Sequence, residues 1–153
     1  MKTITKSVSL VVCIFSMYAA AAQIPPVREP DLNKPLLFQQ LPQQLNCRIT
    51  DLVSLFRFEA GELVSFNAAD NFAINGVVSS TANRDNGKVV SVVVRALNFS
   101  GAVLSFSKIT PDNGETYYTG RIISLQHGDG FEIVNQNGTY VLYKKGFYDM
   151  INE

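Results

Sequence analysis

The chain has no tryptophan, one histidine and two cysteines among its 153 residues. Cys13 lies in an N-terminal apolar run that we expect to be removed, which leaves Cys47 as the one remaining thiol. A single cysteine cannot form an intramolecular disulfide, so the fold must depend on its hydrophobic core. Charged residues are balanced, with 13 basic against 13 acidic groups and no run of one sign. Without a basic excess to neutralise phosphates, we expect no nucleic-acid partner.

Motifs of catalysis and cofactor binding are missing as well. The chain contains neither a Gly-x-Ser-x-Gly nucleophile motif nor a Gly-x-x-x-x-Gly-Lys-Ser/Thr phosphate loop. One histidine and one cysteine cannot complete a zinc site, and no carboxylates cluster with suitable spacing to supply the rest. We therefore expect no catalytic residue, no metal and no cofactor.

The start of the chain is typical of an export signal. Two lysines precede an apolar run, Val8–Met17, and four alanines end at Ala22. This order of charged, apolar and small residues is that of a cleaved signal peptide, and the run is too short for a membrane span, which needs roughly 20 residues. We expect a signal peptide over 1–22, a secreted or periplasmic protein and no transmembrane segment after cleavage. A lipoprotein signal at Cys13 is the weaker alternative, because Val12 is large where a small residue is expected.

The remaining 131 residues suffice for one domain. Residues 23–35 hold four prolines among polar residues, which favours an extended, flexible segment. Residues 36–153 are expected to form a single β-rich domain. It begins with apolar residues spaced three and four apart from Leu41 to Phe56, which predicts a helix over at least 50–56 with Thr50 as its N-cap.

From residue 62 onward, β-branched and aromatic residues alternate with Asn-Gly and Asp-Gly pairs. Those pairs supply the positive φ angles of tight hairpins, and the segments between them are too short for crossover helices. The fold class is therefore mainly β: an antiparallel meander of about seven strands, as a curved sheet or small barrel, with an N-terminal helix and a short C-terminal helix over 147–151. The expected strands are Glu62–Asn67, Phe72–Ala82, Lys88–Leu97, Ala102–Ile109, Glu115–Gln126, Phe131–Asn135 and Thr139–Lys144.

One strand is apolar in both registers. Within residues 89–97, valines occupy positions of either parity, so both faces of the strand must be covered or meet a partner. A covering helix from residues 36–58 is one explanation. Closure into a barrel, which also removes exposed edges, is the other.

Aromatic residues supply the candidates for binding. Tyrosines gather in the last third of the chain, and tyrosine combines a large contact area with few rotatable bonds. Cross-strand pairing of aromatic rings is the ordinary structural explanation. The candidate binding residues are Tyr117, Tyr118, Tyr140, Tyr143 and the single histidine, His127. Two N-glycosylation sequons, at Asn98 and Asn137, matter only where the producing cell glycosylates.

The first functional hypothesis is an exported, non-catalytic β-rich module that binds another macromolecule, a protein or an envelope component. The second is a barrel that carries a small molecule, lined by Phe72, Ile74, Val92, Phe106 and Ile123.

The third hypothesis is a small hydrolytic enzyme that uses His127 together with Asp129 or Cys47. Against it, Asp129-Gly130 is a good hairpin turn, and Cys47 lies between apolar Leu45 and Ile49 as a buried thiol would.

Signal cleavage gives the first prediction. In the producing cell the exported protein should lack residues 1–22 and begin near Gln23, because the small residues ending at Ala22 fit the cleavage site. Intact-mass measurement of the exported protein checks this. A mass that retains residues 1–22 would contradict the prediction.

Overall fold

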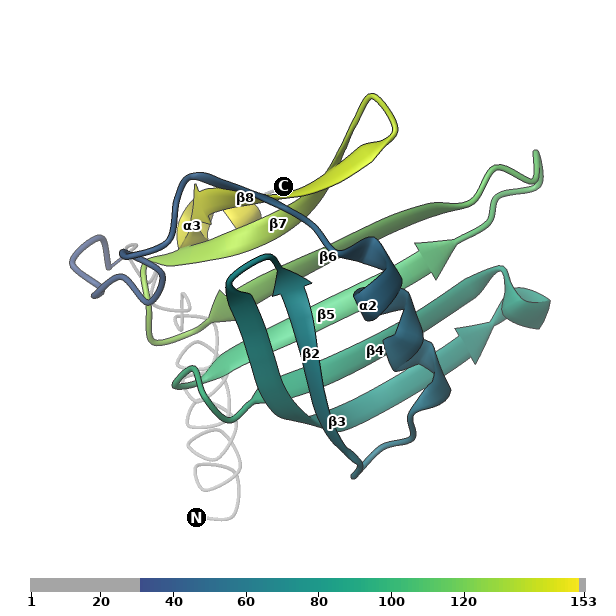
Figure 1. Cartoon of the computed structure of the whole chain (residues 1–153), viewed down its shortest axis with the longest axis horizontal. Helices are drawn as coiled ribbons and strands as arrows, with labels where there is room; N and C mark the ends of the chain where they lie inside the picture. The colour runs from purple at the N-terminus through teal and green to yellow at the C-terminus, as the bar shows by residue number, and fades with distance from the viewer. Residues whose placement is uncertain (1–30, 152–153) are drawn as a thin grey trace, which may run out of the picture. The chain divides into compact units, whose positions relative to one another are not determined.

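The computed structural model describes residues 31–151, which form one sheet with short helical segments (Figure 1). The signal peptide expected over 1–22, and residues 23–30 of the proline-rich segment, lie outside the described residues. The strands are β1 (Gln44–Asn46), β2 (Leu63–Ala69), β3 (Phe72–Arg84), β4 (Val89–Ala96), β5 (Ala102–Ile109), β6 (Tyr117–Ser124), β7 (Asp129–Gln136) and β8 (Thr139–Gly146). The helical segments are α2 (Ile49–Val53), the 3₁₀ turns η2 (Ser54–Arg57) and η3 (Asp85–Gly87), and α3 (Phe147–Ile151).

All neighbouring strands are antiparallel, in the order β1-β8-β7-β6-β5-β4-β3-β2. From β2 to β8 the order in the sheet follows the order in the chain, so this part is a meander. A bulge between Val78 and Ser80 shifts the register of β3 against β4, and such bulges increase local twist and bending. Figure 1 shows β2 and β3 turning over the face of the sheet on which α2 lies, which makes the sheet a curled half-barrel.

The two edges of the curled sheet approach each other at one place, between β1 and α2. The Cys47 amide donates a hydrogen bond to the Tyr140 carbonyl on β8 (3.0 Å), and the next amide, Arg48, donates to the Ala68 carbonyl on β2 (2.9 Å). Cys47 and Ala69 also form an isolated antiparallel bridge. This short stretch of backbone therefore links the two ends of the sheet.

The predicted fold class is confirmed. All seven expected strands are present with bounds within two residues, and the C-terminal helix occupies the expected range. The helix expected over 50–56 appears as α2 followed by η2.

One local expectation was wrong, and one strand, β1, was not expected. Thr50 is not the N-cap: the cap is Arg48, which makes no side-chain cap hydrogen bond and instead pairs with Asp51 (3.0 Å). The bond from the Arg48 amide to β2 fixes where the helix begins. The apolar residues at helical spacing begin at Leu41 and include Leu45, but Leu45 lies in the strand β1, opposite Leu142. This segment is a strand because β8 offers it an edge for pairing.

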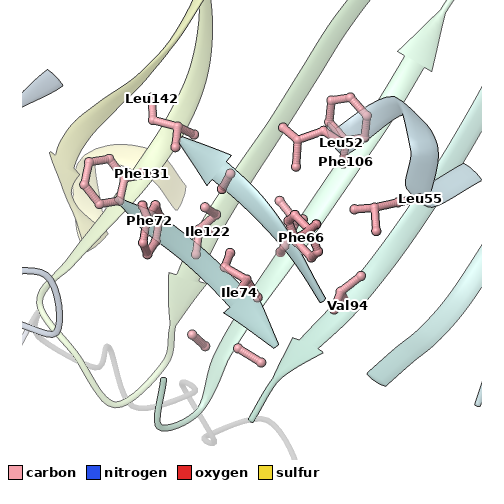
Figure 2. Close-up of a cluster of buried hydrophobic side chains, with 14 of the residues drawn as sticks. Leu52, Leu55, Phe66, Phe72, Ile74, Val94, Phe106, Ile122, Phe131 and Leu142 are labelled. Atoms are coloured by element: carbon pink, nitrogen blue, oxygen red, sulfur yellow. The ribbon is translucent and has the colours of Figure 1, made fainter. Parts of the chain in front are cut away.

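The hydrophobic core fills the concave face of the half-barrel. Figure 2 shows inward-facing side chains of β2 to β8 meeting two leucines from the helical segment, Leu52 and Leu55, both nearly fully buried. In β4 the inward Val92 and Val94 are fully buried under this segment, whereas the outward Val93 is half-buried. A covering helix thus explains why the inner face of this strand is apolar. The outer face stays partly exposed.

A strap formed by residues 31–41 closes one end of the core. Its Phe38 is 1% exposed and contacts three other phenylalanine rings, at centroid distances of 5.2 Å (Phe131), 5.5 Å (Phe99) and 5.6 Å (Phe72). These tilted and edge-on contacts are favourable geometries for aromatic pairs.

A buried carboxylate holds the strap in place. Asp129 is 4% exposed, and its two oxygens accept hydrogen bonds from the amides of Leu37 (2.6 Å) and Phe38 (3.0 Å). From the other side, the Lys144 ammonium donates to the carbonyls of Phe38 (2.7 Å) and Leu41. Strap backbone groups that would otherwise be buried without partners are thereby satisfied.

This arrangement predicts the effect of Asp129→Asn. The variant should lose about 2 kcal/mol of unfolding free energy, because a carboxylate accepting two amide hydrogen bonds is replaced by a group with one acceptor oxygen. Urea unfolding measures the loss as a lower midpoint with an unchanged slope. The matched control is Asp112→Asn, since that carboxylate pairs with Lys88 (2.5 Å) at an exposed position and should change stability by less than about 0.5 kcal/mol. Equal effects of the two substitutions would refute the role of Asp129.

Candidate functional site

The four candidate tyrosines divide into two pairs. Tyr118 and Tyr140 face the core side, and their rings meet edge-on at 5.6 Å. Tyr118 also stacks on the buried Phe106 at 5.7 Å, and its amide donates to the Tyr140 hydroxyl (3.0 Å). These two rings therefore pack within the fold. Tyr117 and Tyr143 face the outer side of the sheet. Both are exposed, so their rings are accessible to a binding partner.

His127 lies in the turn between β6 and β7, and its ring is engaged. Its Nδ1 is 2.8 Å from the Ser124 hydroxyl. This contact has the composition of a nucleophile–base pair. The serine side chain is 1% exposed and lies close to the carbonyl of Ser100 (3.3 Å). A nucleophile must reach its substrate, and this hydroxyl is covered. Asp129 follows His127 by two residues, but both of its carboxylate oxygens accept hydrogen bonds from amides of the strap.

Cys47 lies at the opposite end of β7 from His127. Its amide binds the Tyr140 carbonyl, and Tyr140 pairs with Asn135 near the end of β7, whereas His127 precedes the start of that strand. At ~3.3 Å per residue, the strand separates the two positions by roughly 20 Å, far beyond hydrogen-bond reach. The structure therefore does not bring Cys47 and His127 together. Burial raises the pKa of the Cys47 thiol to about 12, which disfavours the thiolate.

The residues proposed to line a ligand-carrying barrel pack into the core instead of lining a space. Phe72, Ile74, Val92 and Phe106 are at most 1% exposed and belong to the same cluster as Phe38 and the two helical leucines. For Ile123 the expectation was wrong. Ile122 is the inward residue at this point of β6, and Ile123 faces the outer surface, because successive strand residues point to opposite faces.

The outer surface carries an apolar groove over β5 and β6. It has a volume of about 430 Å³ and is lined by Gly101, Val103, Ser105, Ile123, Leu125 and Gln126. Val103 and Ile123 are directly opposite each other across the two strands, so they form a continuous apolar floor. At the end of β6, Leu125 is 74% exposed. We call this the outer groove.

Basic side chains flank the outer groove. Arg95 on β4 pairs with Val103, and Arg121 on β6 pairs with Ser105, so both project from the same face of the sheet as the groove. Arg121 is engaged by Glu132 (3.9 Å) and by the Met150 carbonyl of α3. Arg95 is exposed and makes no ion pair with any described residue. Arg95 thus lies, without an ion pair to any described residue, on the strand beside the apolar floor, and the Lys34 ammonium donates a hydrogen bond to the Leu125 carbonyl at the end of the groove (2.8 Å).

Sequence reasoning did not find the outer groove. The residues that form it include alternate positions of β5, Val103 and Ser105, together with Ile123 on β6 and Leu125 just beyond the end of that strand. The outward positions of these two strands mix apolar with polar residues, so the sequence carries no clear signal for an apolar surface there. Only the register of β5 against β6 shows that the residues lie side by side.

Comparisons with protein families, curated proteins and solved structures find no match to this chain. Within residues 31–151, no helix is long and apolar enough to span a membrane. The same residues contain no group of three or more His, Cys, Asp or Glu side chains arranged to hold a metal ion.

The thiol at the linked edges should be inert in the folded protein. With a pKa raised to about 12, almost none of Cys47 is thiolate at pH 8, and the thiolate is the reactive form. Iodoacetamide should modify Cys47 of the processed protein at least about a hundredfold more slowly in the native state than in denaturant. Peptide mass mapping after timed labelling measures this, and comparable rates in the two states would contradict it.

The same raised pKa makes stability depend on pH. The thiol form is favoured by the fold, so its contribution is fully present below the unfolded pKa of about 8.5 and is lost as the pH rises from there toward 12. Between pH 8 and pH 10 the wild-type protein should therefore lose unfolding free energy relative to Cys47→Ala, which has no group to ionise. Urea midpoints at the two pH values measure this difference.

Proposed function

We propose that the protein is an exported, non-catalytic module that binds another macromolecule or an envelope component through its outer groove. The observation that carries this proposal is the position of exposed apolar surface. The concave face is filled by the core and the strap, while an apolar groove of about 430 Å³ lies on the outer face. Contiguous exposed apolar surface on a folded domain is typical of an interaction site.

The two rival functions receive less support. A small-molecule carrier needs interior space, and the residues expected to line that space are packed against one another. A hydrolase using His127 needs a substrate to reach its partner, and the partner hydroxyl of Ser124 is buried. The export signal comes from the sequence and defines the compartment in which the partner would be met.

The outer groove also has the size of a specific site. Its volume lies within the roughly 300–1,000 Å³ of typical ligand pockets, and two of its lining residues, Ser105 and Gln126, are polar and can orient a ligand. The exposed Tyr143 lies on the same face, opposite Glu132 on β7. This tyrosine would extend a larger contact surface beyond the groove itself.

Site-specific photo-crosslinking in the producing cell tests the proposal. A benzoylphenylalanine in place of Ser105, inside the outer groove, should give a discrete crosslinked product. The control places the same residue at Ser65, which is also an exposed serine, on β2 outside the groove. Products from both positions alike, or from neither, would contradict binding at the groove.

A further inference from the structure

We infer that the occupant of the outer groove is a single apolar chain with an anionic head, the chemistry shared by fatty acids and acidic membrane lipids. This inference rests on the proposed function and names the kind of partner. It follows from the hydrogen-bonding state of the groove floor, the apolar side chains on that floor and the cation beside it.

The backbone of the groove floor has no hydrogen bonds left to offer. β5 is paired along its length with β6 on one side and with β4 on the other. β6 is likewise paired with β7 from Gly120 to Ile123. An extended peptide laid over this floor would lose water from its amides and carbonyls without gaining partners, at about 1–3 kcal/mol for each unsatisfied group. A hydrocarbon chain carries no such groups and loses nothing by desolvation.

The side chains of the groove suit a hydrocarbon chain. Val103 and Ile123 form the floor, and Leu125, with most of its surface exposed, stands at one end. Gly101 lies at the same end with φ of +66°, and a Cβ there would come within 3.0 Å of the Ser124 hydroxyl. A side chain at this position would therefore crowd the buried Ser124 hydroxyl and be strained by the positive φ, which favours glycine at this end of the groove.

Arg95 supplies the charge for the head. It is the direct cross-strand neighbour of Val103, so its exposed side chain leaves the sheet on the same face as the apolar floor, and no described acidic residue pairs with it. A guanidinium binds carboxylate and phosphate oxygens with well-directed hydrogen bonds. The apolar floor matches the hydrocarbon chain of an anionic amphiphile, and Arg95 matches its head group.

Direct titration tests this chemistry. Processed protein from the producing cell is titrated with dodecanoate below its micelle concentration, and with dodecanol as the neutral-headed ligand, by calorimetry. Dodecanoate should bind in a one-to-one ratio, and more tightly than dodecanol. Sedimentation with phosphatidylglycerol and phosphatidylcholine vesicles separates the two sources of the ligand. Binding to anionic vesicles would assign a membrane lipid, and binding to dodecanoate alone would assign a free fatty acid.

Two variants with matched controls locate the binding. Leu125→Ser should weaken dodecanoate binding about tenfold, because a leucine that covers the chain is lost. Leu63→Ser, which removes a leucine of equal 74% exposure from β2, should leave it unchanged. Arg95→Gln should weaken dodecanoate binding about fivefold and leave dodecanol unaffected, whereas Arg84→Gln, an exposed arginine on β3, should affect neither.

Several results would overturn the inference. Absence of binding to both dodecanoate and anionic vesicles excludes the proposed chemistry, and equal effects of Leu125→Ser and Leu63→Ser exclude the site. Crosslinking from position 105 to an identified protein, without dodecanoate binding, would leave the proposed function standing and reject the amphiphile. Absence of both crosslinking and amphiphile binding would reject the two together.

Discussion

The concave face of a curled sheet must be filled, and the rest of this structure depends on how Phe38, together with Leu52 and Leu55, fills it. Curling turns apolar side chains from seven strands toward one another, and without an insert they would surround an empty space. Phe38 reaches this space from a strap with no regular secondary structure, so its backbone must be held by side chains. Asp129 and Lys144 do this from two sides. The filled core and the two ionic groups that hold the strap are therefore parts of one arrangement.

Because the concave face is filled, the surface that can contact a partner lies on the outside of the sheet. A half-barrel with an open interior would bind a ligand within, whereas one whose interior is packed keeps only its outer face and its turns for contact. On that face, polar residues such as the hydrogen-bonded pair Ser91 and Ser107 (2.8 Å) alternate with apolar ones. At one end of β5 and β6, the paired Val103 and Ile123 lie beside the exposed Leu125 and line the outer groove. The groove, with Arg95 on the neighbouring strand, distinguishes this part of the outer face.

Much of the fold could be predicted from the sequence because its signals are local. Turn pairs such as Asn137-Gly138, where both residues have positive φ, mark hairpins without reference to the rest of the chain. The errors involve partners that are distant in sequence. Thr50 is a better intrinsic N-cap than Arg48, yet the bond from the Arg48 amide to Ala68 decides where α2 begins. β1 has no strand pattern of its own and exists because β8 offers it an edge.

The candidate site was harder to predict for the same reason. Tyrosines are conspicuous in a sequence, but Tyr118 and Tyr140 are distinguished from Tyr117 and Tyr143 only by the face on which each lies. The outer groove needs the register of two strands, and Ile123 changes from an expected interior residue to a surface one with a shift of one position. No single-residue signal carries that information.

The strap has a consequence for the order of events during synthesis. Leu37 and the carboxylate that binds it are 92 residues apart, and Asp31 and the Tyr148 hydroxyl that its amide binds are 117 apart. A chain made from its N-terminus cannot lock the strap, or pair β1 with β8, until nearly all of it has been made. Contacts of such long range also slow folding, because their loop-closure entropy must be overcome first. For the export proposed above, such a delay would keep the chain unfolded during its passage, since its last strands are required before the strap and β1 can be secured.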